Sequence, residues 1–376
     1  MTVSLTPEAR KALQALPAEA PPPNVMPNFE HPWSMRESAE GALHSLLAIS
    51  TILFILKMYA QVRITRKLSP EDYVLALAWL VYVGAFEPTG TLLARAPMGV
   101  HQWDITLGQF ATHLFFQYCT LIIWGIIILL IKITILFQYI RVFVPGKTRN
   151  FTFWASHILI YLNAVYYIAF VFLQMFSCSP REKFWDKTIP EGHCLDIFAI
   201  NVSGAVVCLA SDIAILLLPQ RVVFRLNLSR SKKMGLGFIF TIGIFACVTS
   251  AVRLYYNIML WKNQTDITYQ LAFMSFWGTA QIPTGFLITC LPTLPKVIKH
   301  IRNKPWCVRL EESIRTKLHI STGQSQKPAA VKIVTIGGGG AQKQKATVVS
   351  DIEFRELVAM KTNQTNSASS IAIQSD

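Results

Sequence analysis

Two charged residues lie inside long apolar runs of the sequence, and they are the first candidates for chemistry. Lys132 interrupts the run from Leu121 to Phe143, and Asp212 lies in a second run that ends at Pro219. A charged side chain at the centre of a bilayer costs roughly 3 kcal/mol on insertion scales, so such residues face a bundle interior and find partners. Counted along a helix, both residues lie at similar depths. We therefore predict that they pair, either to hold helices together or to act in a switch or transport step.

Further polar residues lie inside the apolar runs. Glu87 and Arg253 are expected toward the outer leaflet, where a polar pocket for a ligand is the alternative to a structural role. Gln281 is expected near the middle of the bilayer, where it can bridge the level of Lys132 and Asp212 and the level of Glu87 and Arg253. Lys57 lies nearer an inner end, and its side chain is predicted to extend to the lipid headgroups. The candidate buried polar network therefore comprises Glu87, Lys132, Asp212, Arg253 and Gln281.

Sequence signatures of catalysis are missing. The chain contains no HExxH, Walker A or GxSxG motif, and no cysteines or histidines at metal-ligand spacing. His101 and Asp104, in the segment GVHQWD, share one loop and could bind a metal, although capping and loop packing explain them as well. We therefore predict a protein that is not an enzyme and that carries no cofactor or metal.

The composition indicates a membrane protein. The 376 residues are 52% hydrophobic and only 15% charged, against about 25% charged residues in soluble domains. The mean hydropathy is +0.39. The net charge of +14 could suggest nucleic acid. However, the lysines and arginines cluster in short segments between apolar runs, which is the orientation signal of a multi-pass membrane protein, so a nucleic-acid partner is not expected.

Seven apolar runs are each long enough for a helix to cross a bilayer, which takes about 20 residues. We predict an all-α fold, a seven-transmembrane helix bundle, with spans at 42–62, 72–93, 109–140, 151–176, 196–219, 235–259 and 269–293. Lysine and arginine gather after the first, third, fifth and seventh spans. The positive-inside rule therefore predicts that the N-terminus lies outside and the C-terminus in the cytoplasm. The membrane is predicted to be either the plasma membrane or an endomembrane.

This topology assigns the flanking segments and two modifications. Residues 1–40 are predicted to be a poorly ordered, proline-rich extracellular extension, 41–300 the membrane domain, and 301–376 a disordered cytoplasmic tail. Cys178 and Cys194 share one outer loop, where an oxidising exterior favours a disulfide. Of the glycosylation sequons, Asn263 alone is predicted to lie in an outer loop and is the candidate acceptor.

Several short motifs occur in an order and spacing that resemble those of the fungal rhodopsin-domain family, which includes the SAT-four group and the Pth-eleven-like receptors. The resemblance covers about residues 42–300. It includes EDYVLALAW, the outer-loop motif with Gly99, His101, Trp103 and Asp104, and KITILFQYIRVF from Lys132 to Phe143. It also includes CSPREKFW with Cys194, DIAILLLP at Asp212, SAVRL at Arg253, and CLPTLP from Cys290. Gln281 stands where family members often carry an acidic residue.

The resemblance implies either a receptor-like sensor or an accessory membrane protein encoded with a secondary-metabolite pathway. We expect a receptor-like sensor whose partners are the lipid bilayer, a small-molecule ligand and a cytoplasmic signalling protein at the basic inner loops. The alternative is a transporter or export accessory for a small apolar metabolite, although no internal repeat supports it. A retinal Schiff base is not expected, because the seventh run contains no lysine.

Overall fold

The fold is taken from a computed structural model that describes residues 7–144, 151–225 and 230–302. The chain divides into two compact units, Met1–Ile314 and Arg315–Asp376. The second unit lies wholly outside the described residues, as does the predicted cytoplasmic tail from residue 303 onward.

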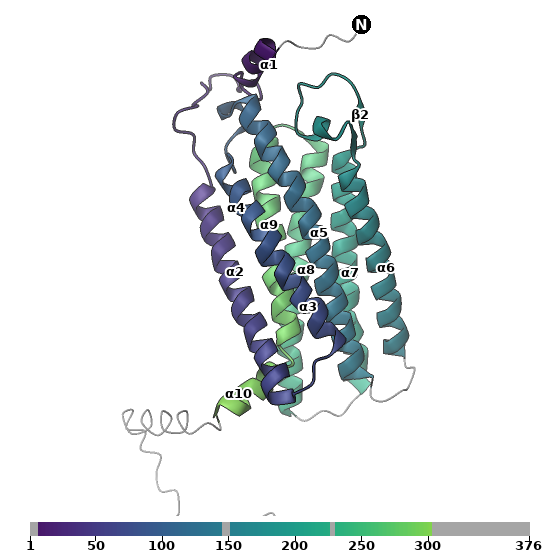
Figure 1. The fold of residues 1–376 in the computed structure, drawn as a ribbon. Helices are drawn as coiled ribbons and strands as arrows, with labels where there is room; N and C mark the ends of the chain where they lie inside the picture. The colour runs from purple at the N-terminus through teal and green to yellow at the C-terminus, as the bar shows by residue number, and fades with distance from the viewer. Residues whose placement is uncertain (1–6, 145–150, 226–229, 303–376) are drawn as a thin grey trace, which may run out of the picture. The chain divides into compact units, whose positions relative to one another are not determined.

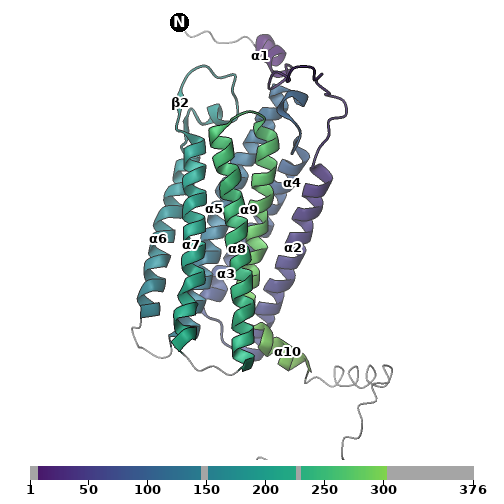
Figure 2. The same cartoon turned by 180° about the vertical axis from the view of Figure 1, so that it is seen from behind.

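Seven long helical segments run side by side in the described part of the chain (Figures 1 and 2). The first is α2 (Arg36–Tyr59) with the π-helical turn η1 (Ala60–Thr65), and the second is α3 (Pro70–Val81), η2 (Tyr82–Phe86) and α4 (Glu87–Arg95). The others are α5 (Leu107–Phe143), α6 (Phe151–Met175), α7 (Ile197–Arg225), α8 (Arg230–Lys262) and α9 (Ile267–Cys290). The predicted helical architecture is confirmed, and each predicted span overlaps one segment.

Six of these segments are long and apolar enough to cross a membrane, judged by length and composition over the described residues. Helix α9 has 24 residues, which is long enough at 1.5 Å per residue. It is not among the six, because polar residues are spread along it. Six candidate membrane-spanning helices are thus established.

Helix α5 is the centre of the bundle. It packs against α3, α4, α6, α7 and α9, while α7 packs on α8, α8 on α9, and α9 on α2. Its buried residues include Trp124, Ile127 and Leu136, which join the main apolar core with Tyr82 and Phe286. A helix that is apolar on nearly every face can be surrounded by other helices, and this explains why the longest apolar run occupies the middle.

Local signals fix where these helices begin. Thr106 precedes α5 and accepts a hydrogen bond from the Gln109 backbone N–H, while Gln109 Oε1 accepts one from the Thr106 N–H. This reciprocal capping box satisfies donors that the first helical turn leaves free. At α3, Pro70 occupies the first turn, and the Ser69 N–H donates to Asp72 Oδ2 over 2.9 Å.

Helix α6 carries the most evident lipid-facing surface. Ile158, Leu162, Val165, Ile168 and Phe172 are all exposed, although they are large apolar side chains. A contiguous apolar patch of this kind is unusual on a soluble monomer. It fits a helix whose outer face contacts acyl chains.

The N-terminal extension differs from the prediction of a poorly ordered segment. It forms the short helix α1 (Pro7–Gln14), and the following residues then pair with the loop between α4 and α5. The Ala18 N–H donates to the Ile105 carbonyl and the Leu107 N–H to the Leu16 carbonyl, each over 2.9 Å. Part of the extension is therefore held by backbone hydrogen bonds to a neighbouring loop, and its extracellular location stays a prediction.

Candidate functional site

Lys132 and Asp212 meet in the middle of the bundle. Lys132 Nζ on α5 lies 2.6 Å from Asp212 Oδ1 on α7, and the lysine is 3% exposed. The ammonium also donates to the Cys208 carbonyl over 3.0 Å and to Ser211 Oγ. Three acceptors therefore take the three donors of a buried lysine.

The pair continues into a chain of hydrogen bonds across α8 and α9. Ser250 Oγ donates to the second carboxylate oxygen, Asp212 Oδ2, and Gln281 Nε2 donates to Ser250 Oγ. The structure thus brings Lys132, Asp212 and Gln281 together through Ser250. Four helices, α5, α7, α8 and α9, share one buried polar network, which we call the central network.

Arg253 lies beside the central network but has a different partner. Its guanidinium carbon is 3.5 Å from the centroid of the Trp124 ring, and Trp124 Nε1 donates to the Gly278 carbonyl over 3.1 Å. Arg253 Nη1 has no hydrogen-bond partner, and no described carboxylate lies within ion-pair distance of the guanidinium. The side chain nevertheless is only 4% exposed.

Arg253 borders a small cavity between α5, α8 and α9. Its volume is about 20 Å³, enough for one ordered water, and its lining includes Gln117, Thr120 and Ser275. A second cavity, of about 40 Å³, shares Thr120 and Ser275 with the first and extends toward α2 and α4. The second lining is mostly aliphatic and aromatic, so a polar end adjoins an apolar one.

Glu87 does not join this set, contrary to the prediction of one buried network. Glu87 Oε1 instead lies 2.5 Å from His44 Nδ1 of α2. The His44 side chain is 55% exposed, so this pair lies at the edge of the bundle. Pro88 follows Glu87 at the start of α4, directly after the π-helical turn η2, and π-helical turns are frequent at functional sites.

Lys57 is a second correction. Its side chain is fully buried rather than extended to the headgroups, with Nζ donating to Gln138 Oε1 over 3.0 Å and lying 3.9 Å from Asp72 Oδ1. Two neighbouring helices supply an acceptor and an anion, so the ammonium needs no headgroup. Sequence reasoning missed Asp72 as a partner, because an acidic residue in a first helical turn is explained by capping alone.

Arg141, at the same end of α5, closes this inner cluster. Its Nη1 lies 2.8 Å from Glu71 Oε1 and also donates to Ser69 Oγ. The inner polar cluster, defined as Lys57, Asp72, Gln138, Glu71 and Arg141, ties α2 and α3 to α5. The adjacent acidic residues at 71–72 were the only signal for it in the sequence.

The outer-loop motif joins two loops. His101 Nδ1 lies 2.5 Å from Asp266 Oδ2, and the His101 ring stacks on Trp103 at 4.5 Å and on Tyr269 at 4.8 Å between centroids. Asp104 Oδ1 accepts from the Asn28 N–H over 2.8 Å. His101 and Asp104 therefore serve separate contacts, and no group of three metal-ligating side chains occurs among the described residues.

Gly99 makes the turn before this motif possible. Its φ of +71° lies in the left-handed region, and an added Cβ would come within 2.6 Å of Met35 Cγ. Both facts favour glycine, which lacks the Cβ that makes this conformation costly. The Met35 N–H also donates to the Met98 carbonyl over 3.1 Å, so this loop meets the start of α2.

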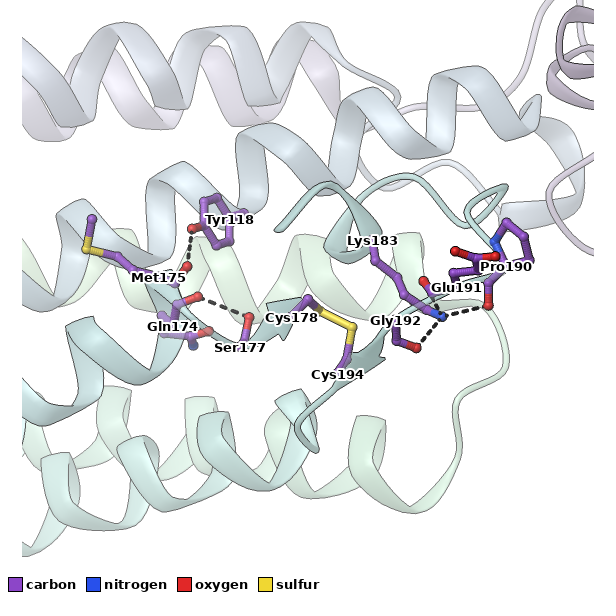
Figure 3. The surroundings of a disulfide bond; sticks show 10 residues. All are labelled: Tyr118, Gln174, Met175, Ser177, Cys178, Lys183, Pro190, Glu191, Gly192 and Cys194. Carbon is purple, nitrogen blue, oxygen red and sulfur yellow. Dashed lines mark hydrogen bonds between the residues drawn. A yellow bond between two sulfur atoms is a disulfide. The ribbon is translucent and has the colours of Figure 1, made fainter. Parts of the chain in front are cut away.

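Cys178 and Cys194 are joined by a disulfide in the loop between α6 and α7 (Figure 3). They lie on the short antiparallel strands β1 (Cys178–Ser179) and β2 (His193–Cys194). Lys183, on the turn η4 (Arg181–Phe184), donates to the carbonyls of Pro190, Glu191 and Gly192, so it closes the same loop from within (Figure 3). Burial, and then the nearby Lys183, lower the pKa of Lys187 in this loop.

Asn263 is exposed in the turn between α8 and α9, where its Oδ1 accepts from Thr265 Oγ1 over 3.1 Å. The sequon is therefore accessible. The sequons predicted to be cytoplasmic, at Asn150, Asn227 and Asn363, lie outside the described residues.

These features define a multi-pass helical membrane protein with charged groups buried between its helices. The family profile described as the fungal rhodopsin domain matches residues 56–300. The chain therefore belongs to the fungal rhodopsin domain family, as the motifs indicated.

Three curated relatives have similar sequences. "Fugralins biosynthesis cluster protein 2" of Gibberella zeae is 32% identical over 87% of this chain and 80% of its own length. "SAT4 family membrane protein" of Emericella nidulans is 34% identical over 55% of this chain and about half, 51%, of its own length. "Wortmanamides biosynthesis cluster protein C" of Talaromyces wortmannii is 26% identical, with coverages of 65% and 66%. No solved structure matches the chain.

Proposed function

We propose that this protein is a receptor-like sensor with seven membrane spans and no enzymatic activity, associated with a secondary-metabolite pathway. The observation that carries the proposal is the central network, which links four helices beside a cavity with an unpaired arginine. A ligand that binds one hydrogen-bonding arrangement of this network more tightly than another would shift the protein toward that arrangement. Two relatives are named for biosynthesis clusters, which supports the pathway association.

Helix α9 is proposed as the seventh span. It packs between α2, α5 and α8, and its polar residues Gln281, Thr284 and Thr289 are buried. Polar side chains that face a bundle interior lower the hydropathy of a helix without meeting lipid. With seven spans, the basic loops after the odd-numbered spans support an N-terminus on the outer side. The basic inner loops are then the proposed contact for a cytoplasmic signalling partner.

This topology predicts where glycans attach. In microsomes, Asn263 should be the one native sequon that the oligosaccharyltransferase in the lumen can reach. Asn227 and Asn363 should stay unmodified, because the proposed topology assigns them to the cytoplasmic side. Peptide mass spectrometry before and after glycosidase treatment measures this. An engineered sequon in the N-terminal extension serves as the positive control, since Asn263 is close to the membrane. A glycan on Asn227 or Asn363 would reverse the proposed orientation.

A transporter carries its ligand across the membrane, and a sensor binds its ligand without carrying it across. We expect the ligand to be found in the culture of the organism that encodes this protein, as a compound that raises the melting temperature of the purified protein. The protein should bind this compound and should not speed its passage across the membrane of proteoliposomes. The assay screens an organic extract by thermal shift, then measures the release of each stabilising compound from vesicles with and without protein. Release that depends on the protein would favour the transporter and contradict the sensor.

A further inference from the structure

Arg253 is a buried cation with no anionic partner among the residues that the structure describes. It is 4% exposed, its Nη1 has no hydrogen-bond partner, and Trp124 stacks against one face of the guanidinium. A buried charge is costly unless it is paired and hydrogen-bonded. Lys132 and Lys57, the other cations buried in the described spans, both have carboxylates within 4 Å. Arg253 is the exception among them.

The cavity beside Arg253 carries one further polar group without a hydrogen-bond partner among the described residues. Thr120 lines it, and the Thr120 hydroxyl is buried without a hydrogen-bond partner. Gly278 also lines the cavity, and a Cβ added there would be 3.4 Å from Arg253 Nε, so the missing side chain leaves room for the arginine close to α9. A planar guanidinium with free N–H groups is suited to a carboxylate, which it can bind through two parallel hydrogen bonds.

The adjoining cavity is apolar. Leu43, Leu46, Leu93 and Phe276 line it, and Phe86, which ends the π-helical turn η2, lines both cavities. Each cavity now holds only water-sized volumes, about 20 and 40 Å³. A larger ligand would therefore enter by displacing the Phe86 side chain, at a turn where the helix departs from regular geometry.

We propose that these two cavities form one ligand site for an amphipathic carboxylic acid. The carboxylate pairs with Arg253 and accepts from the Thr120 hydroxyl, and the apolar part lies between α2 and α4. This inference rests on the proposed function, since it names the chemical class of ligand that the sensor recognises. The acid comes either from the bilayer, as a free fatty acid, or from solution, as a dissolved metabolite.

The test measures binding to the full chain in nanodiscs, with empty nanodiscs subtracted. Dodecanoate should bind about 10- to 100-fold more tightly than dodecanol, the range expected from a charge-assisted hydrogen bond. Arg253→Gln should remove this preference for the acid. Arg95→Gln, a change at an exposed arginine paired with Glu40, should keep it.

A second variant tests the apolar part of the site. It keeps the proposal testable if Arg253→Gln does not fold. Leu43→Phe narrows the apolar cavity, so it should weaken dodecanoate binding while the preference over dodecanol stays. Equal binding of dodecanoate and dodecanol by the unaltered chain would overturn the proposal. A preference that persists in Arg253→Gln would also overturn it, as would acetate binding as tightly as dodecanoate.

Competition then identifies the source of the acid. Displacement of dodecanoate by oleate mixed into the nanodisc lipid supports a bilayer source, and displacement by octanoate added from water supports a dissolved one. Displacement by neither overturns the site. If the unaltered protein binds no carboxylic acid and causes no flux from vesicles, the proposed ligand class is wrong and the sensor proposal stands. Acid binding with protein-dependent flux keeps the ligand class and replaces the sensor with a transporter.

Discussion

Replacing Lys132 with Met, or Asp212 with Leu, should each destabilise the folded protein by about 3–5 kcal/mol, the range for breaking a buried ion pair. Lys132→Met leaves the Asp212 carboxylate with two uncharged donors, the Ser250 hydroxyl and the Cys208 thiol. Asp212→Leu leaves the ammonium with two neutral acceptors, the Cys208 carbonyl and Ser211 Oγ. In both variants one buried charge loses its counter-ion.

The double variant Lys132→Met, Asp212→Leu should recover part of this loss, because it removes both charges together. The measurement is the thermal aggregation midpoint and the monodisperse yield of a fluorescent fusion in detergent, compared as a double-mutant cycle. Ser250→Ala is the matched control, since it removes one hydroxyl from the same network and no charge. A double variant no better than the worse single would show that the two charges do not stabilise each other.

Replacing Asp72 with Asn should destabilise the packing of α2 and α3 against α5 by a similar amount, about 3–5 kcal/mol. Asp72 is the single described anion within 4 Å of Lys57 Nζ, and Lys57 is fully buried. The substitution preserves shape and removes the charge, and it also replaces one of the two acceptor oxygens that take hydrogen bonds from the Ser69 N–H and Gln61 Nε2. The same fluorescent-fusion assay measures the thermal midpoint.

Glu71→Gln is the matched control for this second prediction. It is the same change in charge at the adjacent residue, but its partner Arg141 is 38% exposed and can reach water. Glu71 is itself buried, but its substitution leaves behind an arginine that water can solvate, so the control should shift the midpoint less. Equal shifts in the two variants would mean that Lys57 is stabilised by Gln138 and not by Asp72.

The order and type of the helices could be predicted from the sequence, because membrane-spanning helices satisfy their own backbone hydrogen bonds. Apolar run length alone then locates each helix, as it did for α5 and α6. The pairing of Lys132 with Asp212 was also accessible, since helical rise converts sequence position into depth. Depth does not give direction around a helix, however, and this is where Glu87 was misassigned.

What the sequence by itself determined is therefore the membrane class, the family and the pairing of Lys132 with Asp212. Tertiary structure alone decided which groups at equal depth face one another: Asp72 toward Lys57, His44 toward Glu87, and Trp124 rather than a carboxylate toward Arg253. It also decided the course of the N-terminal extension, whose partners lie far along the chain. The physical reason is that rotation of a helix about its axis depends on packing against its neighbours, which no single helix encodes.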